Sequence, residues 1–303
     1  MNTQTLSLSR RSLLKFAAGG ALGLGLAASG LPLFGTASDR ASAAVPFEAY
    51  HDVNGATHQA RFNALTAQGY YLLSIGIYAN PNDPRYAAVW VQRPAPAFRA
   101  VHGVDATGYQ VAFDSATAAG FVPITLSATG PANNARFAAV FEQGIAAPWV
   151  ARHGLTTADF EQQMQQARVQ GLIPRSVALY GNPSDRRYAA VWSKNTGNVG
   201  WVYRTLDTAD AYQTQFDQLT SAGYRPSAFE VSGDHQITSV FRNDSIGAYE
   251  ARHNLTSAQY QQAFNDLTAQ GYIPAAVQAG GDGGNVRFAA LFVTANVVMN
   301  AQL

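Results

Sequence analysis

Cysteine is absent from all 303 residues of the chain. Disulfide bonds are therefore excluded, and so is a thiolate acting as a nucleophile or a metal ligand. Lysine is almost as scarce, because Lys15 and Lys194 are the only two. Chemistry that depends on a lysine amine is thus restricted to two positions.

The short motifs of common cofactor and catalytic sites are also missing. The sequence has no Gly-rich phosphate loop, no closely spaced histidine pair and no Asp-x-Asp-x-Asp pattern, which are typical of phosphate, zinc and calcium sites respectively. It has no Gly-x-Ser-x-Gly sequence of a hydrolase nucleophile either. We therefore expect no cofactor and no metal ion, and no motif assigns a catalytic residue.

Residues 1–43 have the pattern of an export signal. Arg10 and Arg11 precede an uncharged apolar run from Phe16 to Gly35, and Ala41-Ser42-Ala43 supplies a small-residue cleavage site. This order is typical of a twin-arginine signal peptide. An uncleaved membrane anchor is the alternative, because the run is about as long as a membrane span. We expect export to the periplasm or outside the cell, with residues 44–303 as one domain free of the membrane after cleavage.

The charge of the expected exported domain differs from that of the whole chain, which is +1. Residues 1–43 hold four of the 20 basic residues and one of the 19 acidic residues, which leaves 16 and 18 and a net charge of −2. Nucleic-acid binding requires a basic surface. We therefore expect no nucleic-acid partner.

What the sequence does contain is a pattern written five times. A glycine followed by Tyr, Phe or Leu recurs at steps of 51, 51, 52 and 48 residues, at Gly69, Gly120, Gly171, Gly223 and Gly271. Such a period is the signature of tandem structural repeats. We assign the repeats to residues 47–95, 96–146, 147–196, 197–246 and 247–303.

The last repeat predicts the elements of one unit most clearly. A short strand over 248–253 precedes a helix with Thr256 as N-cap and Gln259 completing a capping box. Gly271 ends the helix, and two further strands follow over 275–278 and 287–293. The corresponding N-caps are expected at Asn54, Asp105, Thr156 and Asp207. Four third strands begin with an arginine, which we expect to pair with a neighbouring repeat: Arg85, Arg136, Arg187 and Arg287.

These elements define an α+β fold of five tandem strand-helix-strand-strand repeats. One unit cannot bury both its helix and its sheet, so neighbours must stack to form a core. The first and last repeats lack the polar ends of an open stack. This favours closure into a propeller-like, pseudo-fivefold ring, with an open solenoid as the alternative. The tail over 294–303 is expected to add a strand that fastens the ring.

Several of these signals together resemble a known family. They are the Arg-His and Leu-Thr before the helix, the Gly-Tyr-x-Pro at 271–274 and the Arg-Tyr-Ala-Ala-Val-Trp strand at 187–192. The chain resembles bacterial tandem repeat modules of secreted proteins over residues 47–293. It is similar to the N-terminal part of fungal polyglycine hydrolases, where such repeats precede a serine-hydrolase domain of the β-lactamase type.

The resemblance does not bring the catalytic domain with it. That domain would require a Ser-x-x-Lys nucleophile, and the only such string runs from Ser12 to Lys15, inside the expected signal. What the resemblance implies is the accessory repeat module, whose role is binding, positioning or stabilising. We therefore make no assignment of enzyme activity.

The repeated polar positions are the candidate ligand-binding residues. Equivalent sites hold a histidine in four repeats, with Thr205 in the fourth, and an arginine precedes the site in three: His51, His102, His153, His253, Arg152, Arg204 and Arg252. In a closed ring such residues would converge on an anion, or less readily on a metal. In the alternative interpretation each one binds a backbone carbonyl near its helix start, because a structural role recurs in every repeat.

Two other features carry weaker alternatives. The fourth repeat gains Asp234-His235 near Ser232 and Ser239, which could supply a nucleophile, base and orienting group. The four tryptophans could stack on sugars if exposed, although their strand positions favour core packing: Trp90, Trp149, Trp192 and Trp201. The sequence as a whole favours an exported, non-catalytic module that binds or positions a peptide or polysaccharide, with a hydrolase of unrecognised site as the alternative.

Overall fold

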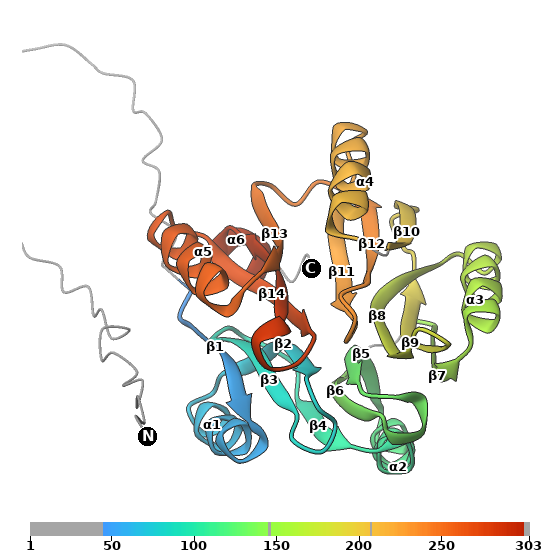
Figure 1. The fold of residues 1–303 in the computed structure, drawn as a ribbon, viewed down its shortest axis with the longest axis horizontal. Coiled ribbons are helices and arrows are strands. Elements are labelled where there is room, and N and C mark those ends of the chain that lie inside the picture. Colours follow the sequence, from blue (N-terminus) through green and yellow to red (C-terminus); the bar gives the residue numbers. More distant parts are fainter. Residues whose placement is uncertain (1–44, 145–146, 207, 300–303) are drawn as a thin grey trace, which may run out of the picture. The chain divides into compact units, whose positions relative to one another are not determined.

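The computed structural model describes residues 45–144, 147–206 and 208–299. They form five repeats, each made of a strand, a helix and two further strands, as predicted (Figure 1). The expected signal over 1–43 and the end of the tail lie outside the described residues. Within them, no helix combines the length and apolar character needed to cross a membrane.

The elements recur at the same place in each repeat. The first strands are β1 (Phe47–Asn54), β4 (Phe98–Val104), β7 (Trp149–Leu155), β10 (Gly200–Leu206) and β13 (Tyr249–Leu255). The helices are α1 (Gly55–Ala67), α2 (Ala106–Ala118), α3 (Thr157–Val169), α4 (Ala209–Ser221) and α5 (Ser257–Ala269). The second strands are β2 (Tyr71–Tyr78), β5 (Phe121–Thr129), β8 (Leu172–Asn182), β11 (Arg225–Val231) and β14 (Ile273–Gly280). The third strands are β3 (Arg85–Val91), β6 (Arg136–Gln143), β9 (Asp185–Lys194), β12 (Ile237–Asn243) and β15 (Arg287–Val293).

Each repeat builds one antiparallel three-stranded sheet whose third strand lies in the middle. The first and second strands are therefore edges, which explains the prolines expected only to stop the helix. Pro123, Pro174, Pro226 and Pro274 lie in second strands, at the point where the register shifts by a bulge. A proline lacks the N–H of a strand ladder and is tolerated at an edge bulge.

The helix boundaries follow the predicted signals in four repeats. The side chains of Asn54, Asp105, Thr156 and Thr256 accept a hydrogen bond from the first turn, and Gln259 completes the expected capping box. In the fourth repeat the N-cap is Thr208, not Asp207, which lies outside the described residues. The prediction was wrong because both residue types cap well and stand side by side.

The helices lie at the periphery of the repeats and the second strands lie innermost (Figure 1). Each second strand contacts the next, in the pairs β2–β5, β5–β8, β8–β11, β11–β14 and β14–β2. An aromatic residue on the helix stacks on the third strand of its own sheet, as Phe160 does on Tyr188 with ring centroids 4.3 Å apart. The paired alanines, such as Ala87 and Ala88, are completely buried beneath this contact layer.

The fourth repeat lacks a feature of the other four first strands. A bulge in those strands contains one residue with positive φ, namely Asp52, Gly103, Gly154 or Asn254. Strand β10 pairs with β12 without any register shift. The fourth repeat has thus lost its histidine and the bulge next to it together.

The tail does not form the fastening strand that we expected. Residues Ala295–Met299 form a short helix, α6, that contacts β14. Val297 and Val298 are completely buried in the same apolar cluster as Val45, at the other end of the described chain. The tail is therefore tied to the core by side-chain packing.

The arginines that begin the third strands also differ from expectation. Arg85 binds Asp83 at 2.9 Å and Arg187 binds Asp185 at 2.7 Å, each within its own hairpin. Arg136 and Arg287 donate to the carbonyl of the preceding residue. The partners belong to the same repeat because the turn before the strand brings them closer than any neighbour.

Candidate functional site

Each repeated histidine lies where its repeat meets a neighbouring helix. His102 Nε2 is 3.0 Å from Gln59 Oε1 on α1, His153 Nε2 is 2.9 Å from Gln110 Oε1 on α2, and His253 Nε2 is 2.8 Å from Gln213 Oε1 on α4. The histidines therefore bind a side chain of the preceding repeat, and not a carbonyl near their own helix start. They join successive repeats.

His51 makes the corresponding contact between the first and last repeats. Its Nε2 is 3.1 Å from Ser257 Oγ at the start of α5, and Ser257 donates to Asp52 at 2.5 Å. The ring of His51 also packs edge-on against Tyr260, with centroids 4.8 Å apart. Because the serine proton goes to Asp52, His51 is not placed as a base for Ser257.

The candidate arginines bind their own strands. Arg152, Arg204 and Arg252 each donate to the carbonyl of the preceding residue, at 2.8, 2.9 and 2.8 Å. This is the carbonyl contact of the alternative interpretation. Since each candidate histidine contacts a different helix, the structure does not gather these seven residues around one opening.

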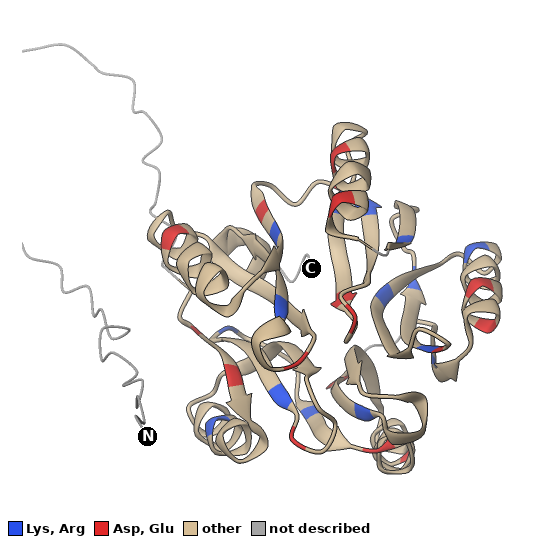
Figure 2. Ribbon diagram, viewed as in Figure 1, with Lys and Arg blue, Asp and Glu red and all other residues tan. Residues whose placement is uncertain are grey.

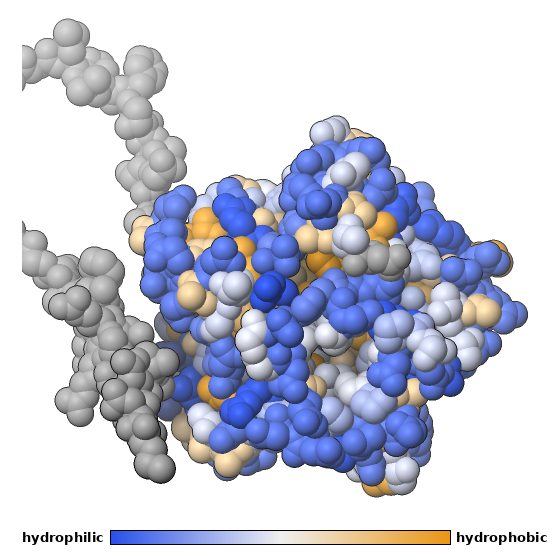
Figure 3. All heavy atoms as spheres, viewed as in Figure 1, coloured by the Kyte–Doolittle hydropathy of each residue, from blue (hydrophilic) through white to orange (hydrophobic). Residues whose placement is uncertain are grey.

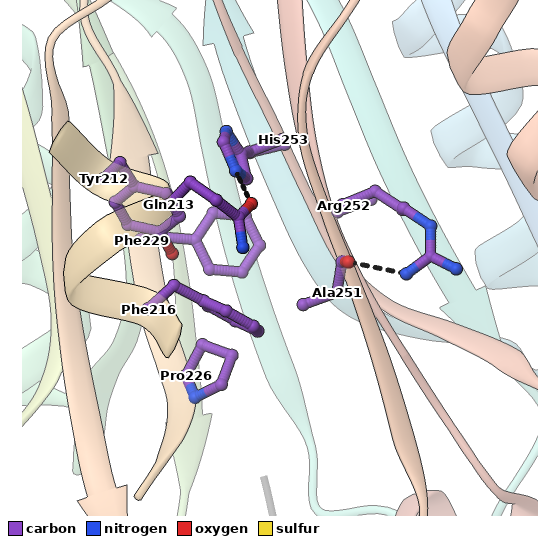
Figure 4. A pocket seen from close by; sticks show the side chains of 10 residues that line it. Tyr212, Gln213, Phe216, Pro226, Phe229, Ala251, Arg252 and His253 are labelled. Carbon is purple, nitrogen blue, oxygen red and sulfur yellow. Dashed lines mark hydrogen bonds between the residues drawn. The ribbon is translucent and has the colours of Figure 1, made fainter. Parts of the chain in front are cut away.

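Two of the histidine junctions nevertheless enclose a pocket. Between the fourth and fifth repeats, His253 and Gln213 lie at the edge of a space of about 290 Å³ whose walls include Tyr212, Phe216 and Phe229 (Figure 4). Apolar surface reaches the exterior between α4 and α5, on a face that is otherwise mostly hydrophilic (Figure 3). Between the second and third repeats, His153 lines a wider groove of about 600 Å³ with Tyr109 and Trp149.

A third pocket, which we call the central pocket, draws on all five repeats. Its volume is about 280 Å³. The second strands supply two neighbouring residues each, next to the bulge: Leu73 and Ser74, Ile124 and Thr125, Arg175 and Ser176, Ser227 and Ala228, Ala275 and Ala276. No residue predicted as a binding residue lines it.

Most hydroxyl groups of the central pocket are already engaged in holding strands. Ser74 accepts from Val277 N at 3.3 Å, and Ser176 accepts from Leu126 N at 2.9 Å while donating to Leu126 O. Ser227 donates to Val240 O at 3.1 Å. These serines explain how adjacent second strands stay together without forming one continuous sheet.

One charged group stands apart in the central pocket. Arg175 makes no hydrogen bond to another described residue, and its nearest acidic atom is Glu142 Oε2 at 4.0 Å. That oxygen accepts from Tyr71 at 2.8 Å, and the Arg93 guanidinium lies 5.0 Å from the centre of the Tyr71 ring. Burial lowers the pKa of Arg175, opposed by the Glu142 charge. Charges of both signs are otherwise scattered over the repeats (Figure 2).

One step further along the second strands lies a buried carboxyl group. The equivalent positions are Gly76, Ser127, Ala178, Glu230 and Gln278. Glu230 is completely buried, and Ser127 of the second repeat donates to its Oε1 at 2.9 Å. Its Oε2 has no partner among the described residues. Burial raises the pKa of Glu230 well above its usual value, with the Ser127 hydrogen bond opposing it.

The alternative catalytic group of the fourth repeat is not assembled. Ser232 donates to Asp234 at 2.6 Å, whereas His235 Nε2 lies 2.6 Å from the backbone oxygen of Asn285. Asp234 also pairs with Arg186 of the third repeat. The printed contacts give Ser232 no histidine partner, so these residues link repeats.

Tryptophan and metal alternatives can be placed as well. Trp90, Trp192 and Trp201 are buried, whereas Trp149 is partly exposed in the groove beside His153. Nowhere in the described parts of the chain do three or more histidine or acidic side chains gather closely enough to hold a metal ion.

Together these features define an α+β tandem repeat protein in which polar side chains join successive units. The family model for the polyglycine hydrolase-like structural repeat matches the sequence five times, over residues 44–93, 95–144, 146–195, 198–241 and 246–295. The chain therefore belongs to the polyglycine hydrolase-like structural repeat family, which confirms the resemblance. The matched unit is a structural repeat and assigns no reaction.

The central pocket was missed because its residues do not recur. Equivalent positions hold Leu73, Ile124, Arg175, Ser227 and Ala275, which share neither charge nor size. A sequence signal does exist, since all five lie one residue after the proline position that marks the bulge. A variable position inside an otherwise repeated pattern would have been the clue.

Proposed function

We propose that the five repeats close into a ring and that the ring is a non-catalytic binding module. Support for closure comes from the junction between the last and first repeats. Ser74 of β2 accepts from Val277 of β14, and Gln278 donates to Ile75 O at 3.2 Å. The same junction carries the His51–Ser257 contact. An open solenoid would leave these groups without partners.

The observation that carries the binding proposal is the central pocket. Five repeats of different sequence contribute to it, and it combines apolar walls with one guanidinium free of hydrogen bonds. Ligand pockets have this composition. Its volume of about 280 Å³ is at the lower limit of such pockets, which suits the end of a chain. The ligand we propose is the end of a peptide or glycan met by an exported protein at the cell envelope or outside the cell.

The test blocks the pocket without touching the repeat contacts. Ala276 is partly exposed and lines the pocket, so Ala276→Trp should fill it. The control is Val169→Trp, at a position 89% exposed on α3. The full chain would be screened against peptidoglycan fragments, polysaccharides and Gly-rich peptides, with product analysis for cleavage in parallel.

Binding that is lost in Ala276→Trp and kept in Val169→Trp is the expected result. A second variant, Thr125→Phe, fills the same pocket from another repeat if the first one folds poorly. Binding that survives both fillings would overturn the central pocket as the site. Cleavage of any tested ligand would overturn the non-catalytic assignment.

A further inference from the structure

Arg175 is the feature of the central pocket with the most specific chemistry. Its side chain is 34% exposed, and it reaches the pocket from the third repeat without a hydrogen bond to any described residue. A guanidinium carries five donors in a planar fork that matches a carboxylate. Leaving all of them without a protein acceptor inside a pocket is unusual for a purely structural arginine.

The neighbours of Arg175 leave the pocket with positive charge. Glu142 is the acidic residue nearest to it, at 4.0 Å, and its Oε2 already accepts from Tyr71. Arg93 lines the same pocket, and Arg242 lies close enough for its charge to disfavour a second positive charge on Arg175. Arg242 is itself paired with Asp244 at 2.8 Å. An added anion would therefore meet two guanidinium groups, Arg93 and Arg175, against one shared carboxylate.

The rest of the lining distinguishes between anionic ligands. Leu73, Ile124, Phe229 and Leu291 provide apolar walls, and the serine hydroxyls are bonded to neighbouring backbone groups. A sugar acid would bury several hydroxyl groups here with few free partners, which is unfavourable. A carboxylate attached to an apolar residue satisfies the arginine and the walls together.

We propose that the central pocket binds the C-terminal carboxylate of a peptide, with Arg175 as the residue that recognises it. The inference rests on the proposed binding function and names its ligand class. The last side chain of the peptide would pack between Ile124 and Phe229 on the pocket wall. Specificity for a free chain end would follow from charge and from the small volume of the pocket.

The experiment compares peptides that differ only in the terminal group. Tetrapeptides ending in Gly, Ala or Leu would be titrated calorimetrically into the full chain, each as the free acid and as the amide. Hydrogen bonds to charged groups contribute enough to binding that the free acid should bind about tenfold or more tightly than the amide. In Arg175→Gln this ratio should fall to near one, with little change in affinity for the amide.

Control variants separate recognition from folding. Arg136→Gln removes an arginine that binds only the carbonyl of Ala135 in its own hairpin, and the acid-to-amide ratio should stay unchanged. Arg175→Lys keeps the charge but not the fork, so part of the preference should remain. Circular dichroism and the melting temperature would verify that each variant is folded.

The outcomes distinguish this inference from the proposed function. Equal binding of acid and amide, both lost in Ala276→Trp, would overturn the carboxylate inference and leave the binding module intact. Binding of an acidic oligosaccharide that depends on Arg175, without binding of any peptide, would overturn the peptide assignment. If free-acid peptides bind Ala276→Trp as tightly as the unmodified chain, both the inference and the site fail.

Discussion

His58 is the residue at which the first helix departs from the other four. The equivalent positions hold Tyr109, Phe160, Tyr212 and Tyr260, all of them buried. His58 is completely buried too, and it stacks on Tyr86 as the aromatic rings do in other repeats, with centroids 4.5 Å apart. It takes the place of an aromatic side chain while adding a group that titrates.

The imidazole of His58 should make stability depend on pH. Burial, and secondarily the charge of His102, lowers its pKa from 6.5 to about 3. Between these values the unfolded chain binds a proton that the folded chain does not. The free energy of unfolding should therefore fall as the pH falls below about 6.5, by up to about 1.4 kcal/mol per pH unit.

The variant that tests this is His58→Phe, which imitates Phe160. Urea unfolding at pH 8 and pH 5 should show a smaller loss of stability on acidification than in the unmodified chain. At pH 8 the variant loses only the Tyr50–His58 hydrogen bond of 2.9 Å, a cost of about 1 kcal/mol. An unchanged loss between pH 8 and pH 5 would contradict the assignment to His58.

Glu230 predicts the opposite pH dependence. Because burial raises its pKa in the folded state, the unfolded chain releases the proton at lower pH than the folded chain does. The contribution of this group to stability is thus lost as the pH rises above the ordinary value of 4.5. Glu230→Gln should stabilise the protein at pH 8 more than at pH 5, as measured by urea unfolding. The control Glu161→Gln, on the exposed face of α3, should leave the profile unchanged.

At the scale of single elements, the bulged first strand shows how conformation and space act separately. Gly103 and Gly154 have nearly the same φ, 69° and 70°. A Cβ at Gly103 would lie 2.6 Å from the Tyr86 hydroxyl oxygen, whereas a Cβ at Gly154 would meet nothing within 4 Å. The two positions therefore differ only in the second cost.

Replacing each glycine by alanine should separate these costs. Gly154→Ala should lower the free energy of unfolding by about 1–2 kcal/mol, the cost of a left-handed conformation. Gly103→Ala should cost more, because Tyr86 must also move. Asparagine tolerates this conformation better and occupies it at Asn254, so Gly154→Asn should cost less than Gly154→Ala. Equal losses for the two alanine variants, measured by urea unfolding, would show that Tyr86 moves without cost.

The elements themselves were largely predictable from the sequence, because their signals are local. Thr256 and Gln259 mark a helix start within four residues, and Gly271 marks its end. The order of strands in each sheet was not predictable in this way, since it depends on pairing between segments. For the same reason the prolines of the second strands were interpreted only as helix stops, although they mark bulges at a sheet edge.

Contacts between repeats were harder to predict than the repeats. The repeated histidines indicated a conserved geometry inside the chain, but not that each binds the helix before it, such as His153 with Gln110. The central pocket depends on one residue from each of five second strands, and these residues have no common type. A pattern search finds what repeats, whereas the proposed site is built from what does not.

At the scale of the whole molecule, closure of the ring predicts that the position of the chain ends is unimportant. Val45 lies in the same apolar cluster as Val297 and Val298, so the two ends of the described chain meet the same core. A circular permutant could join these ends with a flexible linker and open the chain between β3 and β4, at residues 94–97. Loops at exposed sites tolerate such changes, and residues 94–97 contain no helix or strand.

If the ring is closed, the permutant keeps every contact between repeats, including those of β14 with β2. It should then unfold in a single transition, with a melting temperature within a few degrees of that of the original chain. A matched permutant opened inside β3, at Ala87–Ala88, breaks a buried central strand and should not fold. In an open solenoid the linker would have to span the whole stack, and the first permutant would be as unstable as the second. Calorimetric scans of the two permutants therefore distinguish a ring from a solenoid.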